Sequence, residues 1–534
     1  GWLRARRPRL PRLLKTEIKI SVMELPLEFR EFAAAALGEE IAGELCSNIE
    51  SQEELTSVRV NPFKGGSLER AFHGASGGSG ELSSGGSVDA THGVTEVAGI
   101  AAEPVLWSSL GHYLSSRPVF TLDPLFHAGG YYVQEASSMY MELVKDAIEK
   151  DYSRREDACE GGFFAQKLAA LDLCAAPGGK STHLASLLGE DSLLVSNEVI
   201  KSRAVVLADN IAKWGRENVV VTNNDPADFG AFEELFDLVV ADAPCSGEGL
   251  FRKDPQAVGE WSPANVNLCA QRQQRILADI WPALAPGGYL VYSTCTYNKL
   301  ENDGNLKFLC EELGAEAVKL AAPEGSGIIE TVGGGFQFVP GRVKGEGQYM
   351  ALVRKNGEWE PGAFASAAGY AKGGKKHKGG KDAKGKNQVQ FEKGCNYLPD
   401  NYIKILQGDL VKGYREDLYE RIRFVEENLK TVLSGIAIAE KKGKDYIPHA
   451  DLALTGVVAS MAASSSLPQG ISAVEVGRED ALKFLAKEPL LFPGAPTGYL
   501  LLVYCGLPLG FVKNLGNRSN NLLPMARRIR MNIY

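Results

Sequence analysis

The chain has 534 residues, of which 44% are hydrophobic, and it carries a formal net charge of −8 at pH 7. Its length is sufficient for several domains, and its hydrophobic fraction is typical of a soluble globular protein. The acidic balance excludes nucleic-acid binding by overall basicity, although a local basic groove would still bind phosphates.

The cysteines and the apolar segments exclude further classes. The nine cysteines include no C-x-x-C pair, so a zinc ribbon is not expected and we predict no metal site. An odd number of cysteines in a large chain argues against a secreted disulfide scaffold, and we therefore expect reduced thiols and a cytoplasmic protein. No stretch approaches the roughly 18 continuous apolar residues of a membrane span, so no membrane partner is expected.

The N-terminal part is predicted to be an α+β domain over residues 23–165. Residues 1–22 are basic and lack a long apolar core, so we expect a disordered or artefactual leader rather than a secretory signal. The spacing of Leu27, Phe29 and Phe32 predicts helix from 23 to about 58, and another helix is predicted over 134–150. The Gly- and Ser-rich segment near 65–100 is expected to be a surface insertion.

Strands and helices alternate between residues 166 and 357. We predict strands over 171–173, 192–198, 218–223, 236–242, 289–294 and 348–354. The predicted helices are 181–188, 201–215 and 266–284, and Pro286, Gly287 and Gly288 are predicted to form a turn. This alternation predicts a Rossmann-like, doubly wound α/β domain that binds its ligands at the carboxyl ends of parallel strands.

The C-terminal part is predicted to contain further α+β modules. Residues 358–390 are rich in Gly, Lys and Ala, which is typical of a linker, and their lysines could add salt-dependent attraction to phosphates. An intermediate domain is predicted over 391–455, opening with helices over 418–433. The last module, over 456–534, is predicted to be compact and rich in strands, including 499–504 and 509–512.

A turn of small residues after the first strand of the α/β domain is the first indication of a ligand. The segment from Leu171 to Lys180 is predicted to be a strand, a tight turn and a helix start, and small residues let the backbone approach a ligand closely. Tight packing of a strand on a helix would select the same residues. The segment departs from G-x-G-x-x-G, which argues against a nicotinamide dehydrogenase.

Acidic residues follow the next three strands. Glu198, Asp225 and Asp242 each lie at a predicted strand end. An ionised carboxylate must be solvated or paired, so three of them at one sheet edge are poorly explained by packing. A carboxylate at such a position accepts hydrogen bonds from ribose hydroxyls. A nucleoside-bearing cofactor without a pyrophosphate fits this pattern, and S-adenosylmethionine is the obvious one.

Two cysteines also lie at predicted strand ends. Cys245 follows Asp242, and Cys295 follows the strand 289–294. A thiolate that adds to carbon 6 of a cytosine makes carbon 5 nucleophilic, so that carbon 5 can take a methyl group. The second thiol is a plausible helper in release. Asp242 could hydrogen-bond the base or orient the methyl donor, Lys180 could stabilise charge near the pyrimidine, and the target base must be unpaired or extruded.

These residues resemble the motifs of the Nop2/Sun family of RNA cytosine-5 methyltransferases. The matching segments lie between about 110 and 355, and they are 120–124, 132–136, 171–180, 242–247, 251–255 and 292–296 with Glu301 and Asn302. The resemblance implies a methyltransferase in which Cys295 is the nucleophile and Cys245 assists release. The predicted contacts of S-adenosylmethionine are Cys174, Ala175, Ala176, Pro177, Gly178, Gly179, Lys180, Glu198, Arg203, Asp225 and Asp242.

The C-terminal end resembles the RsmF-like bacterial enzymes of that family, which methylate small-subunit ribosomal RNA. The matching residues are 510–514, Arg518 and 520–524, and they resemble a PUA-like RNA-binding domain. The resemblance implies action on 16S ribosomal RNA, and a monomer is expected. Transfer RNA as the substrate and a noncatalytic RNA-binding assembly protein remain open at this point. So does a DNA cytosine-5 methyltransferase, whose nucleophile would be Cys245.

Overall fold

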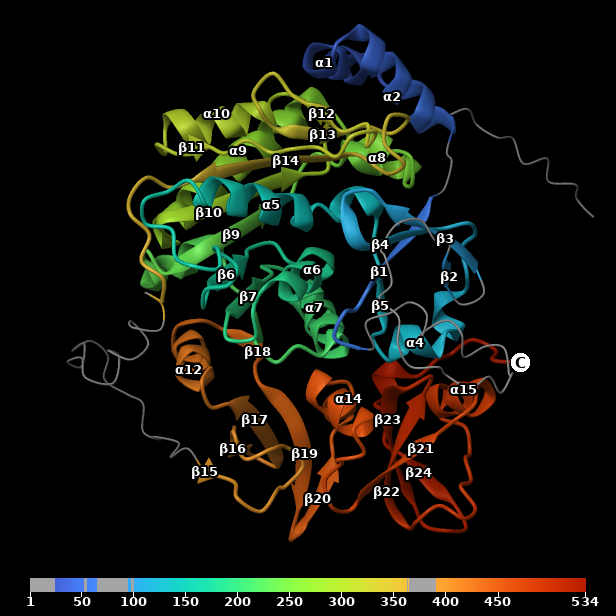
Figure 1. Cartoon of the computed structure of the whole chain (residues 1–534). Helices are drawn as coiled ribbons and strands as arrows, with labels where there is room; N and C mark the ends of the chain where they lie inside the picture. Colours follow the sequence, from blue (N-terminus) through green and yellow to red (C-terminus); the bar gives the residue numbers. More distant parts are fainter. Residues whose placement is uncertain (1–24, 52–54, 65–94, 98–99, 363, 365–389) are drawn as a thin grey trace, which may run out of the picture.

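The computed structural model describes residues 25–51, 55–64, 95–97, 100–362, 364 and 390–534 (Figure 1). The predicted leader over 1–22, most of the Gly- and Ser-rich insertion and nearly all of the Lys- and Gly-rich linker lie outside the described residues. A large α/β layer occupies the middle of the molecule, with a helical pair above it and two small sheets below it (Figure 1). Within the described part of the chain, no helix is long and apolar enough to cross a bilayer.

The N-terminal part combines a helical hairpin with a five-stranded sheet of order β2-β3-β4-β1-β5. The hairpin consists of α1 (Leu27–Leu37) and α2 (Glu39–Ser51). The strands are β1 (Thr56–Val60), β2 (Thr95–Val97), β3 (Ile100–Val105), β4 (Ser108–Leu114) and β5 (Tyr131–Val133). The helix predicted up to residue 58 is therefore wrong at its end, because the β-branched run of β1 is buried in the middle of this sheet.

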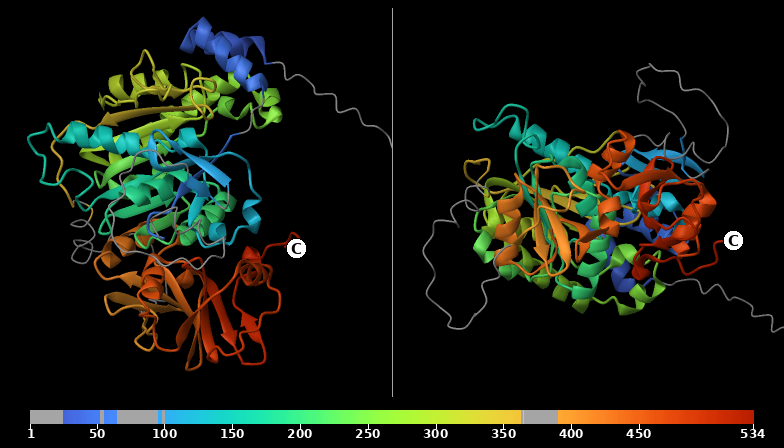
Figure 2. Two further views of the ribbon diagram at one scale, coloured as in Figure 1. Left: turned by 45° about the vertical axis from the view of Figure 1, so that its right-hand side comes forward. Right: turned by 90° about the horizontal axis from the view of Figure 1, so that it is seen from below.

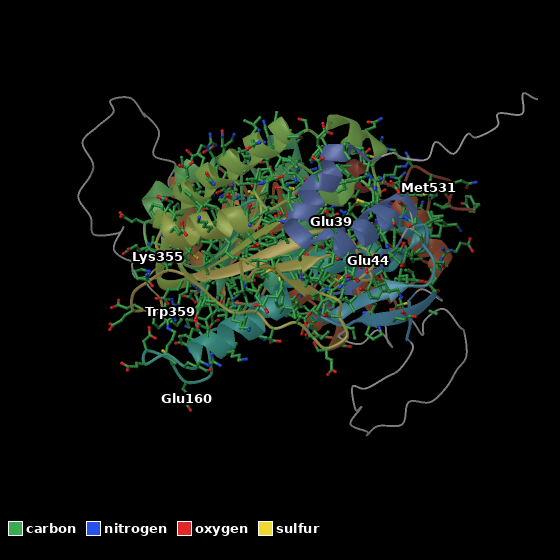
Figure 3. All side chains as sticks on the ribbon, turned by 90° about the horizontal axis from the view of Figure 1, so that it is seen from above. Glu39, Glu44, Glu160, Lys355, Trp359 and Met531 are labelled. Atoms are coloured by element: carbon green, nitrogen blue, oxygen red, sulfur yellow. The ribbon has the colours of Figure 1, made fainter. Side chains whose placement is uncertain are left out.

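The helical hairpin packs on the loops that follow the two strand-end cysteines. The ring of Phe29 lies 5.1 Å from that of Phe251 and 6.4 Å from that of Tyr297. On the outer side, Glu44 of α2 forms an ion pair with Arg342 at 2.6 Å (Figure 3). The N-terminal part therefore covers the region where the sequence predicts the reacting cysteines.

The central sheet has the order β12-β13-β14-β10-β9-β6-β7-β8-β18, with β11 beside β14. Strands β10, β9, β6, β7 and β8 run parallel, and the chain order reverses between β6 and β9. In a doubly wound sheet the ligand crevice lies at such a reversal, outside the carboxyl ends of the strands. The parallel strands are β6 (Ala169–Asp172), β7 (Leu193–Asn197), β8 (Val219–Thr222), β9 (Phe236–Asp242) and β10 (Leu284–Thr294).

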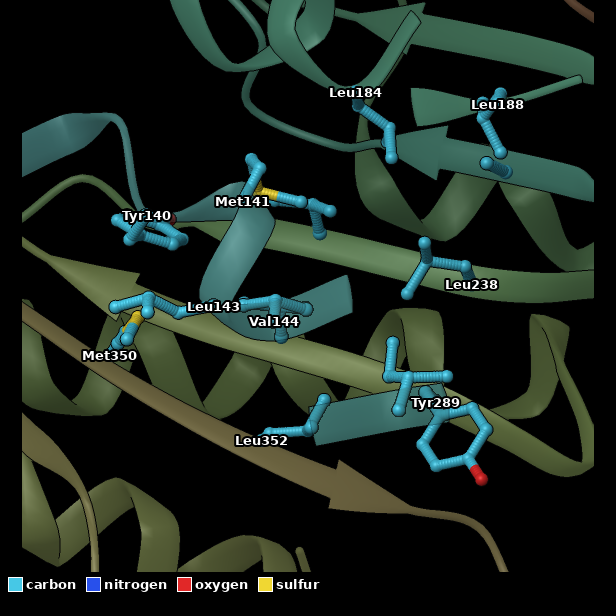
Figure 4. Close-up of a cluster of buried hydrophobic side chains, with 14 of the residues drawn as sticks. Tyr140, Met141, Leu143, Val144, Leu184, Leu188, Leu238, Tyr289, Met350 and Leu352 are labelled. Atoms are coloured by element: carbon cyan, nitrogen blue, oxygen red, sulfur yellow. The ribbon is translucent and has the colours of Figure 1, made fainter. Parts of the chain in front are cut away.

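Helices cover both faces of the central sheet. Leu184 of α6 (Gly179–Leu187) and Val144 of α5 (Met141–Tyr152) pack on one face together with α7 (Lys201–Trp214) (Figure 4). The opposite face packs on α9 (Pro263–Ile280), α10 (Asp303–Glu311) and α12 (Tyr419–Asn428). Burial on both faces explains why the parallel strands are almost wholly apolar in sequence.

The predicted bounds of the strands and helices in this part of the chain agree closely with the structure. Strands β9 and β14 (Gln348–Arg354) have the predicted bounds, whereas β10 begins five residues earlier than predicted. Leu284 already pairs with Phe236, and the register shifts before Tyr289. The predicted turn at 286–288 is thus an irregularity inside a strand, and Gly287 takes a positive φ of 69° there. The antiparallel edge is completed by β11 (Glu316–Ala317), β12 (Ile329–Glu330) and β13 (Phe336–Phe338).

The C-terminal part forms two small sheets below the central sheet (Figure 2). The first contains β15 (Gln390–Phe391), β16 (Tyr402–Gln407), β17 (Leu410–Arg415), β19 (Ile436–Lys442) and β20 (Asp445–Pro448). The second contains β21 (Ile471–Glu475), β22 (Gly498–Tyr504), β23 (Leu507–Asn514) and β24 (Ser519–Asn521). The part opens with strands, so the prediction that it opens with helices is wrong.

One short strand of the C-terminal part belongs to the central sheet. Strand β18 (Thr431–Leu433) pairs antiparallel with β8, with Thr431 opposite Thr222. The helix predicted over 418–433 therefore ends at Asn428. The β-branched Thr431 and Val432 suit a strand that completes the exposed edge of β8.

Candidate active site

The loop between β6 and α6 is shaped for close approach of a ligand. Gly178 precedes α6 with a φ of 116°, a conformation that side chains other than hydrogen rarely adopt. The peptide bond before Pro177 is cis. Burial raises the pKa of Cys174 well above its ordinary value, so this thiol stays protonated. Residues 174–180 therefore form a preorganised backbone turn at the carboxyl end of the sheet, as predicted.

Two side chains of α7 hold carbonyl groups of this loop. Arg203 donates to the carbonyl oxygen of Ala176 at 2.8 Å, and Asn210 donates to that of Pro177 at 2.8 Å. Both donors lie on α7. Among the predicted residues, Arg203 is thus a support of the loop as well as a neighbour of Glu198, from which it lies 3.3 Å.

Arg59 supports the same loop from the N-terminal sheet and was missed by the sequence reasoning. Its guanidinium is fully buried and donates to Gln134 at 2.8 Å, to Thr182 at 2.5 Å and to the carbonyl oxygen of Gly179 at 3.2 Å. It also lies 4.5 Å from the centre of the Trp214 ring. No sequence signal singles out Arg59, because its partners are 75 or more residues away.

The acidic residues after β7 and β8 have different surroundings. The side chain of Glu198 is only 2% exposed, and its Oε1 accepts from the backbone of Ile200 at 2.9 Å. Its Oε2 receives no hydrogen bond from the described residues and forms an ion pair with Arg203 at 3.3 Å. Asp225 is about half exposed, and its carboxylate caps the following helical turn by accepting from Ala227.

Three asparagines join the strand ends that carry these acids. Asn197 donates to the carbonyl oxygens of Leu173 and Asn224 at 3.2 and 2.9 Å. Asn223 donates to the carbonyl oxygen of Glu198 at 2.7 Å. Asn224 exchanges two hydrogen bonds with the backbone of Lys430, next to β18. The C-terminal part therefore supports the loop that leads into Asp225.

Asp242 and Lys180 form an ion pair at the centre of the crevice. The Nζ atom of Lys180 lies 2.8 Å from Oδ2 of Asp242, and Ser293 donates to Oδ1 at 2.6 Å. Tyr140 in turn donates to Ser293 at 2.6 Å. Although burial disfavours the ammonium, the carboxylate of Asp242 raises the pKa of Lys180 above its ordinary value. The structure thus brings together two residues predicted to act on the base.

A second carboxylate lies beneath the same loop. Asp172 ends β6, and its Oδ2 accepts from Ser181 at 2.6 Å. Its other oxygen receives no hydrogen bond from the described residues. Burial raises the pKa of Asp172 to about 7, so this group titrates near neutral pH.

The two predicted reacting cysteines lie side by side. The Sγ atoms of Cys245 and Cys295 are 2.9 Å apart, after the ends of β9 and β10. The hydrogen bond between the two thiols and the burial of the side chain raise the pKa of Cys245 well above its ordinary value. Cys245 therefore keeps its proton and can donate it in a hydrogen bond toward the sulfur of Cys295.

Two buried glutamates hold the loops that carry these cysteines. Glu248 accepts from the hydroxyl of Thr296, from the backbone of Tyr297 and Asn298, and from Trp261. Glu301 accepts from the backbone of Ser246 at 3.0 Å. The sequence motifs contained Glu301, but the supporting role of both residues is visible only in the structure.

The fold and this site define a methyltransferase of the class that uses S-adenosylmethionine. The sheet order, the small-residue turn after β6 and the buried carboxylate of Glu198 fit a nucleoside-bearing methyl donor. No dinucleotide fingerprint accompanies them.

Comparisons with known proteins identify the family. Residues 165–354 match the model of the 16S rRNA methyltransferase RsmB/F family, and residues 472–529 match the methyltransferase RsmF PUA domain. The ribosomal RNA small subunit methyltransferases F of Shewanella sp. strain W3-18-1 and Shewanella putrefaciens are each 31% identical to the chain over 448 residues. Each alignment covers 79% of this chain and 84% of the relative. The chain belongs to the RsmB/F methyltransferase family.

A solved structure supports the fold alone. The crystal structure of PH0851 matches this chain with a TM-score of 0.50 and 24% sequence identity, and the match covers 62% of this chain and 66% of PH0851. The predicted family, the doubly wound methyltransferase domain, the S-adenosylmethionine cofactor and the C-terminal PUA-like domain are confirmed by these matches. A dehydrogenase and a DNA methyltransferase are not favoured.

Proposed function

We propose that this protein methylates carbon 5 of a cytosine in 16S ribosomal RNA through a transient bond between Cys295 and the base. The observation that carries the proposal is the 2.9 Å separation of the Cys245 and Cys295 sulfurs beside the Asp242–Lys180 ion pair. A thiolate nucleophile, a second thiol that assists release and a charged pair beside the base fit this chemistry.

The residues around the crevice fit the cofactor. We assign Cys174, Ala175, Ala176, Pro177, Gly178, Gly179, Lys180, Glu198, Arg203, Asp225 and Asp242 to its binding. The buried Oε2 of Glu198 receives no hydrogen bond from the described residues and lies 3.3 Å from Arg203, and it is an acceptor for a ribose hydroxyl. S-adenosylmethionine supplies an electrophilic methyl group when it is bound.

The two cysteines have different roles in the reaction of the base. The Cys295 thiolate forms a bond to carbon 6, which makes carbon 5 nucleophilic enough to take the methyl group. Loss of the proton from carbon 5 then expels the thiolate and restores the ring. Cys245, which holds its proton in the resting site, assists this release: once its own proton has passed to solvent, its thiolate takes the proton from carbon 5.

The ion pair acts on the pyrimidine. Asp242 is an acceptor that fits the exocyclic amine or a protonated ring nitrogen of the base. Lys180 balances negative charge that develops on the ring, and its raised pKa keeps it protonated. Because stacked bases cannot reach such a pocket, the target cytosine must be unpaired or extruded.

The terminal parts provide the RNA contacts. We propose an N-terminal RNA-binding domain over 23–165, the methyltransferase domain over 166–357, a linker over 358–390, an intermediate domain over 391–455 and a PUA-like RNA-binding domain over 456–534. The curated relatives are named for small-subunit ribosomal RNA, which favours that partner over transfer RNA. We further propose that the protein acts in the cytoplasm as a monomer.

Single cysteine variants test the covalent mechanism. Cys295→Ala is expected to abolish methyl transfer, whereas Cys245→Ala is expected to accumulate a protein–RNA adduct on a denaturing gel. Cys159→Ala, on a loop away from the crevice, is the matched control and is expected to behave like the wild type. Full activity of Cys295→Ala would refute the assignment, and an adduct in that variant instead of Cys245→Ala would exchange the two roles.

Bisulfite sequencing tests the substrate. We expect ribosomal RNA from cells that lack the protein to lose one or more protected cytosines in 16S ribosomal RNA. Loss of protection only in transfer RNA would contradict the proposed substrate while leaving the chemistry in place.

A further inference from the structure

Gln348 lies near the predicted nucleophile, at the start of the neighbouring strand. Strand β14 begins at Gln348 and runs antiparallel to β10, with Thr294 paired to Tyr349. Cys295 directly follows Thr294 and Gln348 directly precedes Tyr349, so the two residues lie at the same end of this strand pair. Gln348 belongs to the wall of the site, although it was not among the predicted residues.

The packing around a neighbouring glycine supports this placement. A side-chain carbon at Gly249 would lie 2.8 Å from the carbonyl oxygens of both Cys295 and Gly347. The backbone on either side of the nucleophile is thus in close contact with the start of β14. Such packing leaves little freedom for the backbone of Gln348.

The carboxylate of Asp242 orients the amide of Gln348. The residue is only 4% exposed, and its Nε2 donates to Oδ1 of Asp242 at 3.3 Å. Because an ionised carboxylate only accepts hydrogen bonds, it selects the nitrogen end of the amide. The carbonyl oxygen of Gln348 consequently points away from Asp242, and no described residue donates to it.

The carboxylate keeps acceptor capacity after these bonds. Oδ1 accepts from Ser293 and Gln348, and Oδ2 accepts from Lys180. A carboxylate offers about four acceptor positions, so at least one remains for a ligand. The wall beside the cysteines therefore presents two kinds of acceptor, a carboxylate and an amide carbonyl.

We propose that Gln348 is a specificity-determining residue that makes the site select cytosine over uracil. The inference depends on the proposed function, since it requires a pyrimidine bound to Cys295. Cytosine carries an amino group at position 4, and uracil carries a carbonyl oxygen there. Asp242 and the amide oxygen of Gln348 accept from the two N–H bonds of the amino group. The carbonyl oxygen of uracil has no proton to donate, so it would be repelled by both acceptors.

Removal of the amide has a predictable effect on the two bases. Gln348→Leu keeps the size of the side chain but loses one acceptor and the donor that orients Asp242. The loss of one such contact lowers the rate with cytosine about tenfold. The penalty for uracil also falls, so the ratio of the two rates decreases.

Trapping with 5-fluoropyrimidine RNA measures this ratio directly. The Cys295 thiolate adds to carbon 6 and carbon 5 takes the methyl group from S-adenosylmethionine, which leaves as S-adenosylhomocysteine. Fluorine replaces the hydrogen at carbon 5, so no proton can be removed and the sulfur–carbon bond persists. Adducts are counted on denaturing gels with 16S transcripts that contain 5-fluorocytidine or 5-fluorouridine.

The variants have distinct expected results. The wild type is expected to trap 5-fluorocytidine RNA and to leave 5-fluorouridine RNA free. Gln348→Leu is expected to trap cytosine about tenfold more slowly, with a smaller ratio between the bases. Gln348→Glu keeps the shape but turns an acceptor toward Asp242, so its cytosine trapping should fall at least as far. Gln390→Leu, on the exposed strand β15, is the matched control.

Binding of S-adenosylmethionine separates this role from a merely structural one. Calorimetry is expected to give a dissociation constant for Gln348→Leu within about twofold of the wild type, because Asp242 loses only its longest contact and keeps its shorter bonds from Lys180 and Ser293. Wild-type rates and base ratio in both Gln348 variants would overturn the inference, as would a tenfold loss of cofactor affinity. Failure of the wild type to trap either RNA would refute the proposed function itself.

Discussion

The two halves of the crevice are held in place in different ways. The cofactor loop after β6 is fixed by donors outside it, chiefly Arg59, Arg203 and Asn210, which bind its carbonyl groups. The cysteine loops are fixed by the buried carboxylates of Glu248 and Glu301, which accept from them. The backbone that is expected to contact the cofactor is therefore held by donor side chains on other elements. The loops that carry the reacting cysteines are instead held by buried carboxylates that accept from their backbone N–H groups.

The largest expected effect is the loss of a buried carboxylate from the cysteine loops. Glu248→Leu would leave several buried donors around residues 296–298 unsatisfied, at about 1–3 kcal/mol each. We expect a lower melting temperature in thermal unfolding and a loss of adduct formation.

Glu260→Leu, on the exposed end of α8 (Pro255–Glu260), is the control for a lost surface charge and is expected to melt as the wild type does. An unchanged melting temperature for Glu248→Leu would show that the cysteine loops do not need their buried charge.

The cofactor half should show a titration that depends on Asp172. Its folded pKa of about 7 lies above the ordinary value of about 3.9 for an unfolded chain. The folded state thus holds a proton that the unfolded state has lost. The contribution of Asp172 is therefore complete below pH of about 4 and is lost as the pH rises through about 7.

Asp172→Asn is expected to remove this part of the pH dependence. Melting temperatures measured between pH 5 and 8 should fall less with rising pH in the variant than in the wild type. The neutral amide retains the shape of the protonated acid beside Ser181. Equal pH dependence in the two proteins would mean that Asp172 is ionised throughout this range.

A smaller effect is expected at the outer support of the cofactor loop. Arg203→Ala removes one bond to the carbonyl of Ala176 and the cation near Glu198, and its side chain is about half exposed. We expect calorimetry to show about fivefold weaker binding of S-adenosylmethionine with normal thermal stability. Arg272→Ala, exposed on α9, should leave the affinity unchanged. If the two variants bind S-adenosylmethionine with equal affinity, Arg203 does not support the loop, and Arg59 and Asn210 are then its main supports.

Most of the catalytic layer could be predicted from the sequence because its signals are local. The apolar run of β9 followed by Asp242, and the small residues after Leu171, have fixed spacings that specify a strand and a turn. The strand at 431–433 could not be predicted, because its partner Thr222 lies more than 200 residues away. The helical pattern of α12 simply continues into it.

The site shows the same division. Residues that face the ligand, such as Cys295 and Asp242, follow strands and stand out as polar groups at apolar run ends. Residues that support the loops without contacting the ligand, such as Arg59 and Glu248, have partners that only the tertiary fold brings near. Gln348 lies between these cases, since the predicted strand over 348–354 included it but no local pattern distinguishes its amide.

The pairing of β18 with β8 has a consequence for how the chain acquires its shape. During synthesis the nascent α/β layer emerges with one border of unpaired amide and carbonyl groups, which is a template for association with other chains. That border stays open until more than 200 further residues have left the ribosome and delivered Thr431 to Thr222. A fragment ending near residue 357 would keep the border open permanently, and it would be prone to aggregate even with every reacting group in place.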